Sequence, residues 1–168
     1  MPRPYIVRLI MDRVHEAMVI IKRRQNGKPY VLGGCVFRPF YGQKFAEIVF
    51  LAITTSEQVK GYGTRLMNRL KDYAKEHQLY YFLTYADNNA IEYFKKQGFT
   101  KSSDRDETPA NHMPERRWKG YIKDYNGSTM MQCAVHRDVE HSTFYGDIRF
   151  QQKQLLAMVA QTTIVAVR

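Results

Sequence analysis

The sequence has 168 residues, of which 44% are hydrophobic and 13% aromatic, and this composition excludes a disordered chain and suits one globular domain. The formal net charge of +10 fits an anionic partner or solubility alone, so charge does not select a function. Two cysteines without a C-x-x-C motif and five histidines without paired-ligand spacing argue against a disulfide framework and a metal site.

The first part of the chain is predicted to form strands. The β-type residues of Tyr5–Ile10 predict a short strand. The apolar runs Met18–Ile21 and Tyr30–Phe37 flank the charged segment 23–27, which ends in glycine, and together predict a hairpin. The pair Gly33–Gly34 indicates a bulge or a close approach of neighbouring backbone.

The middle of the chain alternates between strand and helix patterns. Phe45–Thr54 is an almost continuous apolar run, typical of a buried strand. In Tyr62–His77 the apolar residues follow three- and four-residue steps, which predicts an amphipathic helix. Tyr80–Tyr85 predicts another strand, after which Asp87 or Asn88 is placed to cap a second helix.

The last part of the chain is predicted to contain a loop, a hairpin and a helix. Residues 101–117 are charged and contain two prolines, as loops do. The segments Trp118–Tyr125 and Thr129–Val135 are predicted strands, joined by the turn pair Asn126–Gly127. A final helix is predicted within Phe150–Ala160. This order of elements predicts a mixed α/β fold with helices packed on a central twisted sheet.

A glycine-containing loop, Gln58–Thr64, lies between the buried strand and the amphipathic helix. Gly61 and Gly63 let backbone approach a ligand closely, and the free N–H groups of a helix start suit a phosphate. The residues alone fit a tight strand-to-helix turn equally well. The loop is neither a Walker loop nor a complete dinucleotide fingerprint.

A single carboxylate, Glu47, interrupts the apolar run Phe45–Ile53. Burying a carboxylate is costly unless it is paired or protonated. One hypothesis is a general base whose pKa is raised by apolar neighbours. The residues alone leave two alternatives open, an ion pair with a basic side chain and a position on an exposed strand face.

Longer motifs resemble a known family, the general-control type of nuclear histone acetyltransferase in the GNAT superfamily. The resemblance runs from about Met1 to Cys133. The superfamily-level motifs are Glu47–Thr54 and Gln58–Asn68. The narrower histone-type motifs are Phe82–Asp87, Tyr93–Phe99 and Gly120–Tyr125.

The resemblance implies the GNAT acyl-CoA N-acyltransferase fold and a direct transfer of acetyl from acetyl-CoA to a histone lysine, with no metal. It assigns Glu47 as the general base and Asp87 and Tyr121 to the substrate. The implied contacts to acetyl-CoA are Leu51, Ala52, Ile53, Gln58, Val59, Lys60, Gly61, Tyr62, Gly63, Thr64, Asn89 and Tyr93. In this assignment the backbone N–H of Leu51 faces the carbonyl oxygen of the thioester.

The chain departs from the family pattern in four ways. The family's first strand and two helices are expected to be lacking before Met1–Ile10. Asn89 stands where the family has an aromatic residue. The loop 100–119 is longer than usual and contains the acidic residues Asp104, Asp106 and Glu107. The segment Leu155–Val167 is apolar where the family's last helix is charged, although it is too short to span a bilayer.

These features predict an acetyltransferase domain over residues 1–140 and a C-terminal helical segment over 141–168. We expect a soluble nuclear protein that acts on a histone tail, H3 by preference, together with coactivator subunits, with no membrane contact and no specific DNA readout. Three alternatives remain: an acetyltransferase for small amines or non-histone proteins, a non-catalytic module that binds chromatin, and a simple DNA-binding protein, which only the charge favours.

Overall fold

A computed structural model describes residues 2–103 and 112–163 of the chain. The strands are β1 (Glu16–Arg23), β2 (Pro29–Phe40), β3 (Phe45–Ile53), β4 (Tyr81–Ala86), β5 (Thr100–Lys101) and β6 (Thr129–Ala134). The helices are α1 (Arg3–Met11), α2 (Tyr62–Glu76), α3 (Ile91–Lys96), α4 (Glu115–Trp118) and α5 (Phe144–Thr163), with a short 3-10 turn η1 (Thr55–Glu57).

The strands form one mixed sheet in the order β1-β2-β3-β4-β6-β5. All neighbours are antiparallel except β3 and β4, which run parallel. Their pairing ends at Glu47 opposite Leu83, and β3 then continues to Ile53 without a partner on that side. The mixed α/β sheet predicted from the order of elements is therefore confirmed, and its central pair of strands separates after three residue pairs.

The two faces of the sheet are covered by two apolar clusters, so β3 is buried on both faces as its continuous apolar run predicted. One face packs Ala46 and Ile48 against α2, whose apolar stripe includes Leu66 and Leu70. The other face packs Phe45 into a cluster whose other buried members are Phe40, Leu83, Met113 and Ile122. Since successive side chains of a strand point to opposite faces, Glu47 points to the same face as Phe45.

The predicted hairpin of β1 and β2 is confirmed, and Gly33 explains how closely β2 approaches β3. A Cβ atom at Gly33 would lie 2.4 Å from the carbonyl oxygen of Ala52, a distance that real Cβ atoms essentially never show. The register between β1 and β2 also shifts between Ile20 and Ile21. Both readings of the glycine pair, the bulge and the close approach, therefore hold.

Two sequence predictions are wrong. The predicted strand Tyr5–Ile10 lies in helix α1, which starts beside Pro2 and Pro4, as prolines at a helix start allow. The predicted strand Trp118–Tyr125 is absent, because Trp118 ends α4 and an isolated bridge joins Lys119 to Ile122. Strand β6 pairs with β4 and β5 instead.

The other predictions of elements are confirmed or partly tested. Helix α2, strand β4 and the final helix occur as predicted, with α5 longer at both ends. Asp87 caps the turn before α3, since its Oδ1 accepts the N–H groups of Asn89 (3.0 Å) and Ala90 (2.9 Å). The predicted loop 101–117 gives way to α4 at Glu115. Asp104, Asp106 and Glu107 of that loop lie outside the described residues.

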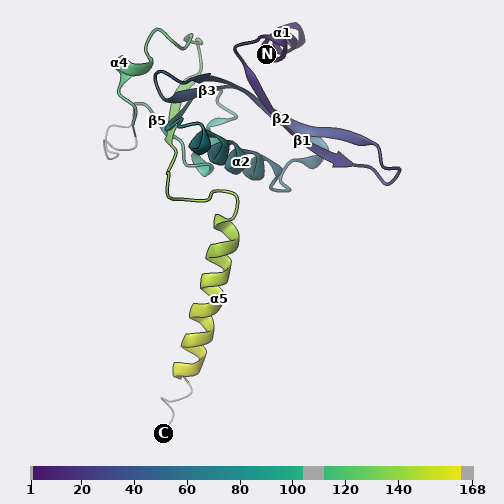
Figure 1. Ribbon diagram of the computed structural model, residues 1–168, viewed down its shortest axis with the longest axis vertical. Coiled ribbons are helices and arrows are strands. Elements are labelled where there is room, and N and C mark those ends of the chain that lie inside the picture. The colour runs from purple at the N-terminus through teal and green to yellow at the C-terminus, as the bar shows by residue number, and fades with distance from the viewer. Residues whose placement is uncertain (1, 104–111, 164–168) are drawn as a thin grey trace.

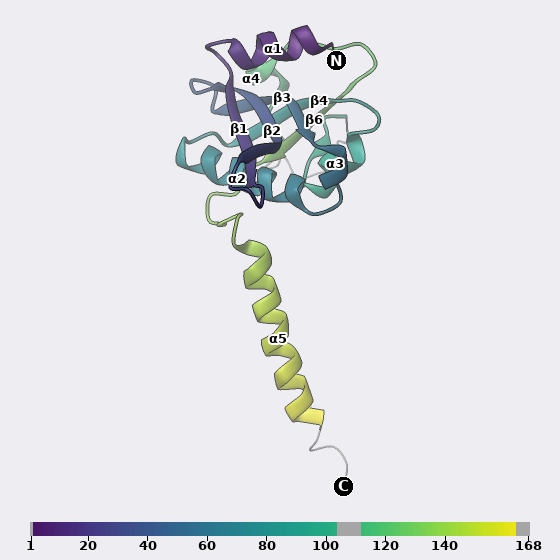
Figure 2. The same cartoon turned by 90° about the vertical axis from the view of Figure 1, so that its right-hand side faces the viewer.

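Helix α5 projects away from the sheet, at the opposite end of the molecule from α1 (Figures 1 and 2). The segment before it is fastened to α2 by Asp72, a buried carboxylate. Asp72 Oδ1 accepts the N–H of His141 at 2.8 Å, and Oδ2 accepts the N–H of Ser142 at 3.0 Å. Within the described residues, no helix is long and apolar enough to cross a membrane.

Replacing Asp72 with Ala is expected to lower the free energy of unfolding by about 2 kcal/mol, because it leaves two backbone donors without their acceptor. Urea unfolding followed by circular dichroism measures this loss. The matched control is Glu76→Ala, which removes an exposed carboxylate from the same helix. Equal losses in the two variants would contradict a structural role for the Asp72 cap.

Candidate active site

A cleft of about 870 Å³ opens where β3 and β4 separate. One wall is the unpaired half of β3, from Ile48 to Ile53, and the other is the end of β4 with the turn that leads to α3. The separation is fixed by a side chain, because Thr84 Oγ1 donates a hydrogen bond to the carbonyl oxygen of Ile48 at 2.9 Å. The fold thus provides a slot beside an open strand edge.

Glu47 is not itself among the residues that line the slot; it lies immediately before Ile48, in the last residue pair of β3 and β4 before the strands separate. Its residue is 9% exposed, so the exposed-face alternative fails. Among the described residues, no basic nitrogen lies within ion-pair distance of its carboxylate, so the ion-pair alternative fails as well. Burial raises the pKa of Glu47 to about 7, and the charge of Arg38 on β2 opposes this only in part. A carboxyl group with this pKa can accept and release a proton at neutral pH.

The open edge of β3 presents backbone donors to the slot. The N–H of Thr54 donates to Leu32 of β2 at 2.7 Å. Backbone N–H groups alternate between the two sides of a strand, so those of Ile53 and Leu51 point away from β2, toward the slot. The carbonyl of Ala52 faces Gly33 on β2. Ala52 therefore contributes its side chain to the slot, and Leu51 and Ile53 contribute their backbone.

The glycine-containing loop closes the far end of the slot. Val59 and Gly61 have φ of 64° and 80°, a sharply bent backbone that leads directly into α2. Gln58 Nε2 donates to the carbonyl oxygen of Ile53 at 3.0 Å, which ties the loop to the end of β3. The first N–H groups of α2 have no acceptor within their helix, so this end of the slot suits an anion.

Tyr93 on α3 locks the start of α2 against the second wall. Its hydroxyl donates to the carbonyl oxygen of Gly63 at 3.0 Å, and burial raises its pKa. A Cβ atom at Gly63 would lie 3.1 Å from the Tyr93 ring, tighter than nine in ten real Cβ contacts, so glycine favours the close packing of the two helices there. The second glycine of the loop therefore serves helix packing as well as the cleft.

Most of the predicted site residues are brought together. Those that line the cleft are Leu51, Ala52, Ile53, Gln58, Val59, Gly61, Gly63, Thr64, Asp87, Asn89 and Tyr93. Lys60 does not line it, and its ammonium pairs with Glu57 at 3.2 Å. Tyr121 also lies outside it, beside Phe40 and Phe45 near the start of β3.

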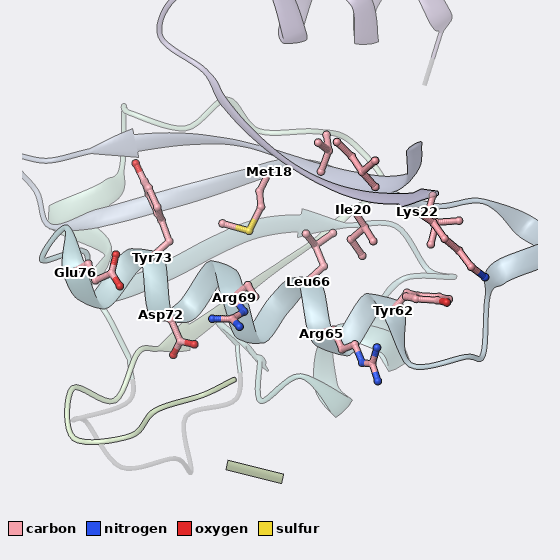
Figure 3. Close-up of a pocket in the computed structure, with 13 residues that line it drawn as sticks. Met18, Ile20, Lys22, Tyr62, Arg65, Leu66, Arg69, Asp72, Tyr73 and Glu76 are labelled. Carbon is pink, nitrogen blue, oxygen red and sulfur yellow. The ribbon is translucent and has the colours of Figure 1, made fainter. Parts of the chain in front are cut away.

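The side chain of Tyr62 lies in a different groove. This second groove, of about 600 Å³, runs between β1 and α2. Figure 3 shows Tyr62 and Arg65 near Lys22 at one end of it, with Tyr73 and Glu76 at the other. Different faces of α2 thus line the second groove and the main cleft. The side chain of Tyr62 lies in the second groove, and only its backbone belongs to the loop of the main cleft.

Tyr85, at the end of the predicted strand Tyr80–Tyr85, was not predicted as a site residue, but it lines the cleft. Burial raises its pKa, and the charges of Asp124 and Glu47 add to this effect. Tyr125, 6.1 Å away between ring centres, is likewise within electrostatic reach of Glu47. No spacing in the sequence signals this pair. In residues 2–103 and 112–163, no group of three or more metal-ligating side chains occurs.

Comparison with known proteins agrees with this geometry. The histone acetyltransferase GCN5 of Oryza sativa subsp. japonica is 48% identical over 156 residues, which are 92% of this chain and 28% of that protein. The GCN5 of Yarrowia lipolytica is 53% identical over 136 residues, 80% of this chain and 27% of that protein. The chain thus spans little more than a quarter of the curated relatives it matches.

Solved structures are similar over most of their length. The crystal structure of Tetrahymena GCN5 has 54% identity and a TM-score of 0.71, over 83% of this chain and 80% of that one. The Tetrahymena GCN5 catalytic domain in complex with coenzyme A has 54% identity and a TM-score of 0.60, over 84% and 78%. Residues 2–99 match the acetyltransferase (GNAT) family. The chain belongs to this GNAT family, with the fold of the Tetrahymena GCN5 catalytic domain.

Proposed function

We propose that this chain catalyses the transfer of acetyl from acetyl-CoA to the side-chain amine of a histone lysine, with H3 as the preferred tail. The observation that carries this proposal is the buried Glu47, with a pKa of about 7, in the last residue pair before β3 and β4 separate into a slot whose wall is an unpaired strand edge. The family membership and the similarity to GCN5 proteins support it.

The chemistry follows from the charge of the acceptor. A lysine amine has a reference pKa of about 10.4, so it is an ammonium at neutral pH and cannot attack. Glu47 takes one proton through a water molecule, and the neutral amine attacks the thioester carbonyl carbon. The N–H of Leu51 donates to the carbonyl oxygen as it gains charge. The nitrogen, positively charged after the attack, then loses its second proton. The carbon–sulfur bond breaks, and the sulfur of coenzyme A leaves with the electron pair and takes up a proton.

Direct attack of the amine on the thioester also fits the buried, protonated thiols of the two cysteines. Burial raises the pKa of Cys35, which lies within the core. Burial likewise raises the pKa of Cys133, against an opposing effect of Lys71. A thiol is nucleophilic as its thiolate, so neither group suits a covalent acetyl intermediate.

We assign acetyl-CoA to the main cleft. Its pyrophosphate fits the bent loop Gln58–Thr64 and the start of α2, and its pantetheine arm fits along β3, where Ile53 offers a backbone N–H. Asn89 and Tyr93 line the opposite wall. The Tetrahymena relative, whose catalytic domain forms a complex with coenzyme A, supports the choice of this cosubstrate.

The acceptor side is assigned by its position relative to Glu47. Asp87 lines the cleft while capping the turn before α3, and the half-exposed Tyr121 packs beside Phe45, two residues before the base. We propose a nuclear enzyme that works with coactivator subunits and has no specific DNA readout. We also propose that catalysis resides in residues 1–140, with 141–168 as a separate helical segment.

Calorimetric titration with acetyl-CoA, followed by initial rates with an H3 tail peptide and with spermidine, tests this function. We expect saturable binding of acetyl-CoA and faster transfer to the peptide. Faster transfer to spermidine would favour an acetyltransferase for small amines. Binding to nucleosomes without any acetyl transfer would favour a non-catalytic chromatin module.

A further inference from the structure

Helix α1 places a tyrosine against the active site from outside the sheet. Tyr5 and Leu9 lie one helical turn apart on the inner face of α1, and Leu9 is buried. The hydroxyl of Tyr5 lies 2.7 Å from that of Tyr125, a hydrogen bond that joins residues 120 positions apart in the chain. A tyrosine hydroxyl in a partly buried position usually has such a partner.

Tyr125 is the link between α1 and the cleft. Its ring packs edge-on against Tyr85, which lines the cleft. Burial raises the pKa of Tyr125 to about 12, and its hydrogen bond with Tyr5 and the charge of Glu47 add to the effect. Tyr125 therefore lies beside Tyr85 of the cleft wall and within electrostatic range of Glu47.

The backbone near Tyr125 gives its ring little support. Residues 119–128 form turns and an isolated bridge, without a strand ladder. The carbonyl oxygen of Tyr125 accepts bonds from the N–H and the hydroxyl of Ser128, which fix the turn that follows. Among the described residues, the hydrogen bond with Tyr5 is the one that holds the polar end of the Tyr125 side chain.

We propose that Tyr5 is a positioning residue, which holds Tyr125 against Tyr85 of the cleft wall and so makes helix α1 part of the acceptor side of the active site. This inference rests on the proposed acetyl transfer. It concerns the acceptor because Tyr85 lies on β4 two residues after Leu83, the register partner of Glu47, and Glu47 removes the proton of the acceptor amine. The loop Gln58–Thr64, assigned to the pyrophosphate, closes the other end of the slot.

The test is the variant Tyr5→Phe, which removes one hydroxyl and keeps the ring. We expect kcat/KM for an H3 tail peptide to fall about two- to tenfold, the range that corresponds to one lost hydrogen bond. We expect the KM for acetyl-CoA to stay unchanged. In a Tyr125→Phe background, Tyr5→Phe should cause no further loss, because the two residues act through one contact.

The matched control is Tyr73→Phe, which removes another partly buried tyrosine hydroxyl, bonded to Glu16 on the α2 side of the sheet. It should leave both kinetic constants unchanged. The proposal would be overturned if Tyr5→Phe caused the same loss of kcat/KM in the unaltered chain and in Tyr125→Phe. It would also be overturned if Tyr5→Phe raised the KM values for the H3 peptide and for acetyl-CoA equally. Either result would indicate that Tyr5 supports the fold in general. Absence of acetyl transfer by the unaltered chain would instead defeat the proposed function itself, and this inference with it.

Discussion

Replacing Glu47 with Gln is expected to reduce kcat for acetyl transfer at pH 7 by at least about 100-fold. General base catalysis contributes about 10² to 10⁴ in rate. Among the described residues, two carboxylates line the cleft, Glu57 and Asp87. Glu57 pairs with Lys60, and Asp87 caps a turn, so neither replaces Glu47. Steady-state kinetics with an H3 tail peptide measures the loss.

The pH dependence of kcat/KM in the unaltered chain and in Glu47→Gln tests whether Glu47 is the general base. A base works when deprotonated, so kcat/KM of the unaltered chain should rise with pH up to about 7 and then level off. The Glu47→Gln variant should lack this rise. The control Glu76→Gln, an exposed carboxylate on α2, should keep both the rate and the profile. A variant at Glu47 that transfers acetyl as fast as the unaltered chain would refute its role as base.

The parts of the site that the sequence predicts come from one continuous segment of the chain. The continuous apolar run of β3 requires burial on both faces, so a carboxylate within it is conspicuous. The bent loop and the start of α2 follow directly along the chain, and two glycines mark them. One strand–loop–helix unit therefore carries most of the site, and its chemistry is local enough to be recognised before the fold is known.

The parts that could not be predicted depend on contacts between distant segments. The residues of Tyr5–Ile10 suit a strand by propensity, but Tyr5 and Leu9 also fit one face of a helix, and packing decides between the two. The pair Asn126–Gly127 does form a turn, with Gly127 at φ 79°, but a turn does not determine which strand pairs with β6. The edges of β6 are taken by β4 and β5, which leaves Trp118–Tyr125 outside the sheet.

Glu47→Gln is also expected to raise the free energy of unfolding above neutral pH. In the unaltered chain, the charged Glu47 should therefore lower stability while it provides activity. The pKa of Glu47 is about 7 in the fold and 4.5 ordinarily. Between these values the folded chain binds more protons than the unfolded chain, so its stability falls as pH rises from 4.5 to 7. At about 1.4 kcal/mol per pH unit, the penalty above pH 7 is about 3 kcal/mol.

A neutral glutamine avoids this penalty, so the variant should gain up to about 3 kcal/mol at pH 8 and almost nothing at pH 4. Urea unfolding at several pH values measures the gain, and Glu76→Gln should show none at any pH. A variant that is less stable than the unaltered chain at pH 8 would mean that Arg38 stabilises the charged carboxylate more than burial opposes it. The same cost of burial raises the pKa of Glu47 toward neutrality and destabilises its charged form. The differences in activity and in stability between Glu47→Gln and the unaltered chain should therefore both develop as pH rises toward 7. A site built this way exchanges stability for a working base.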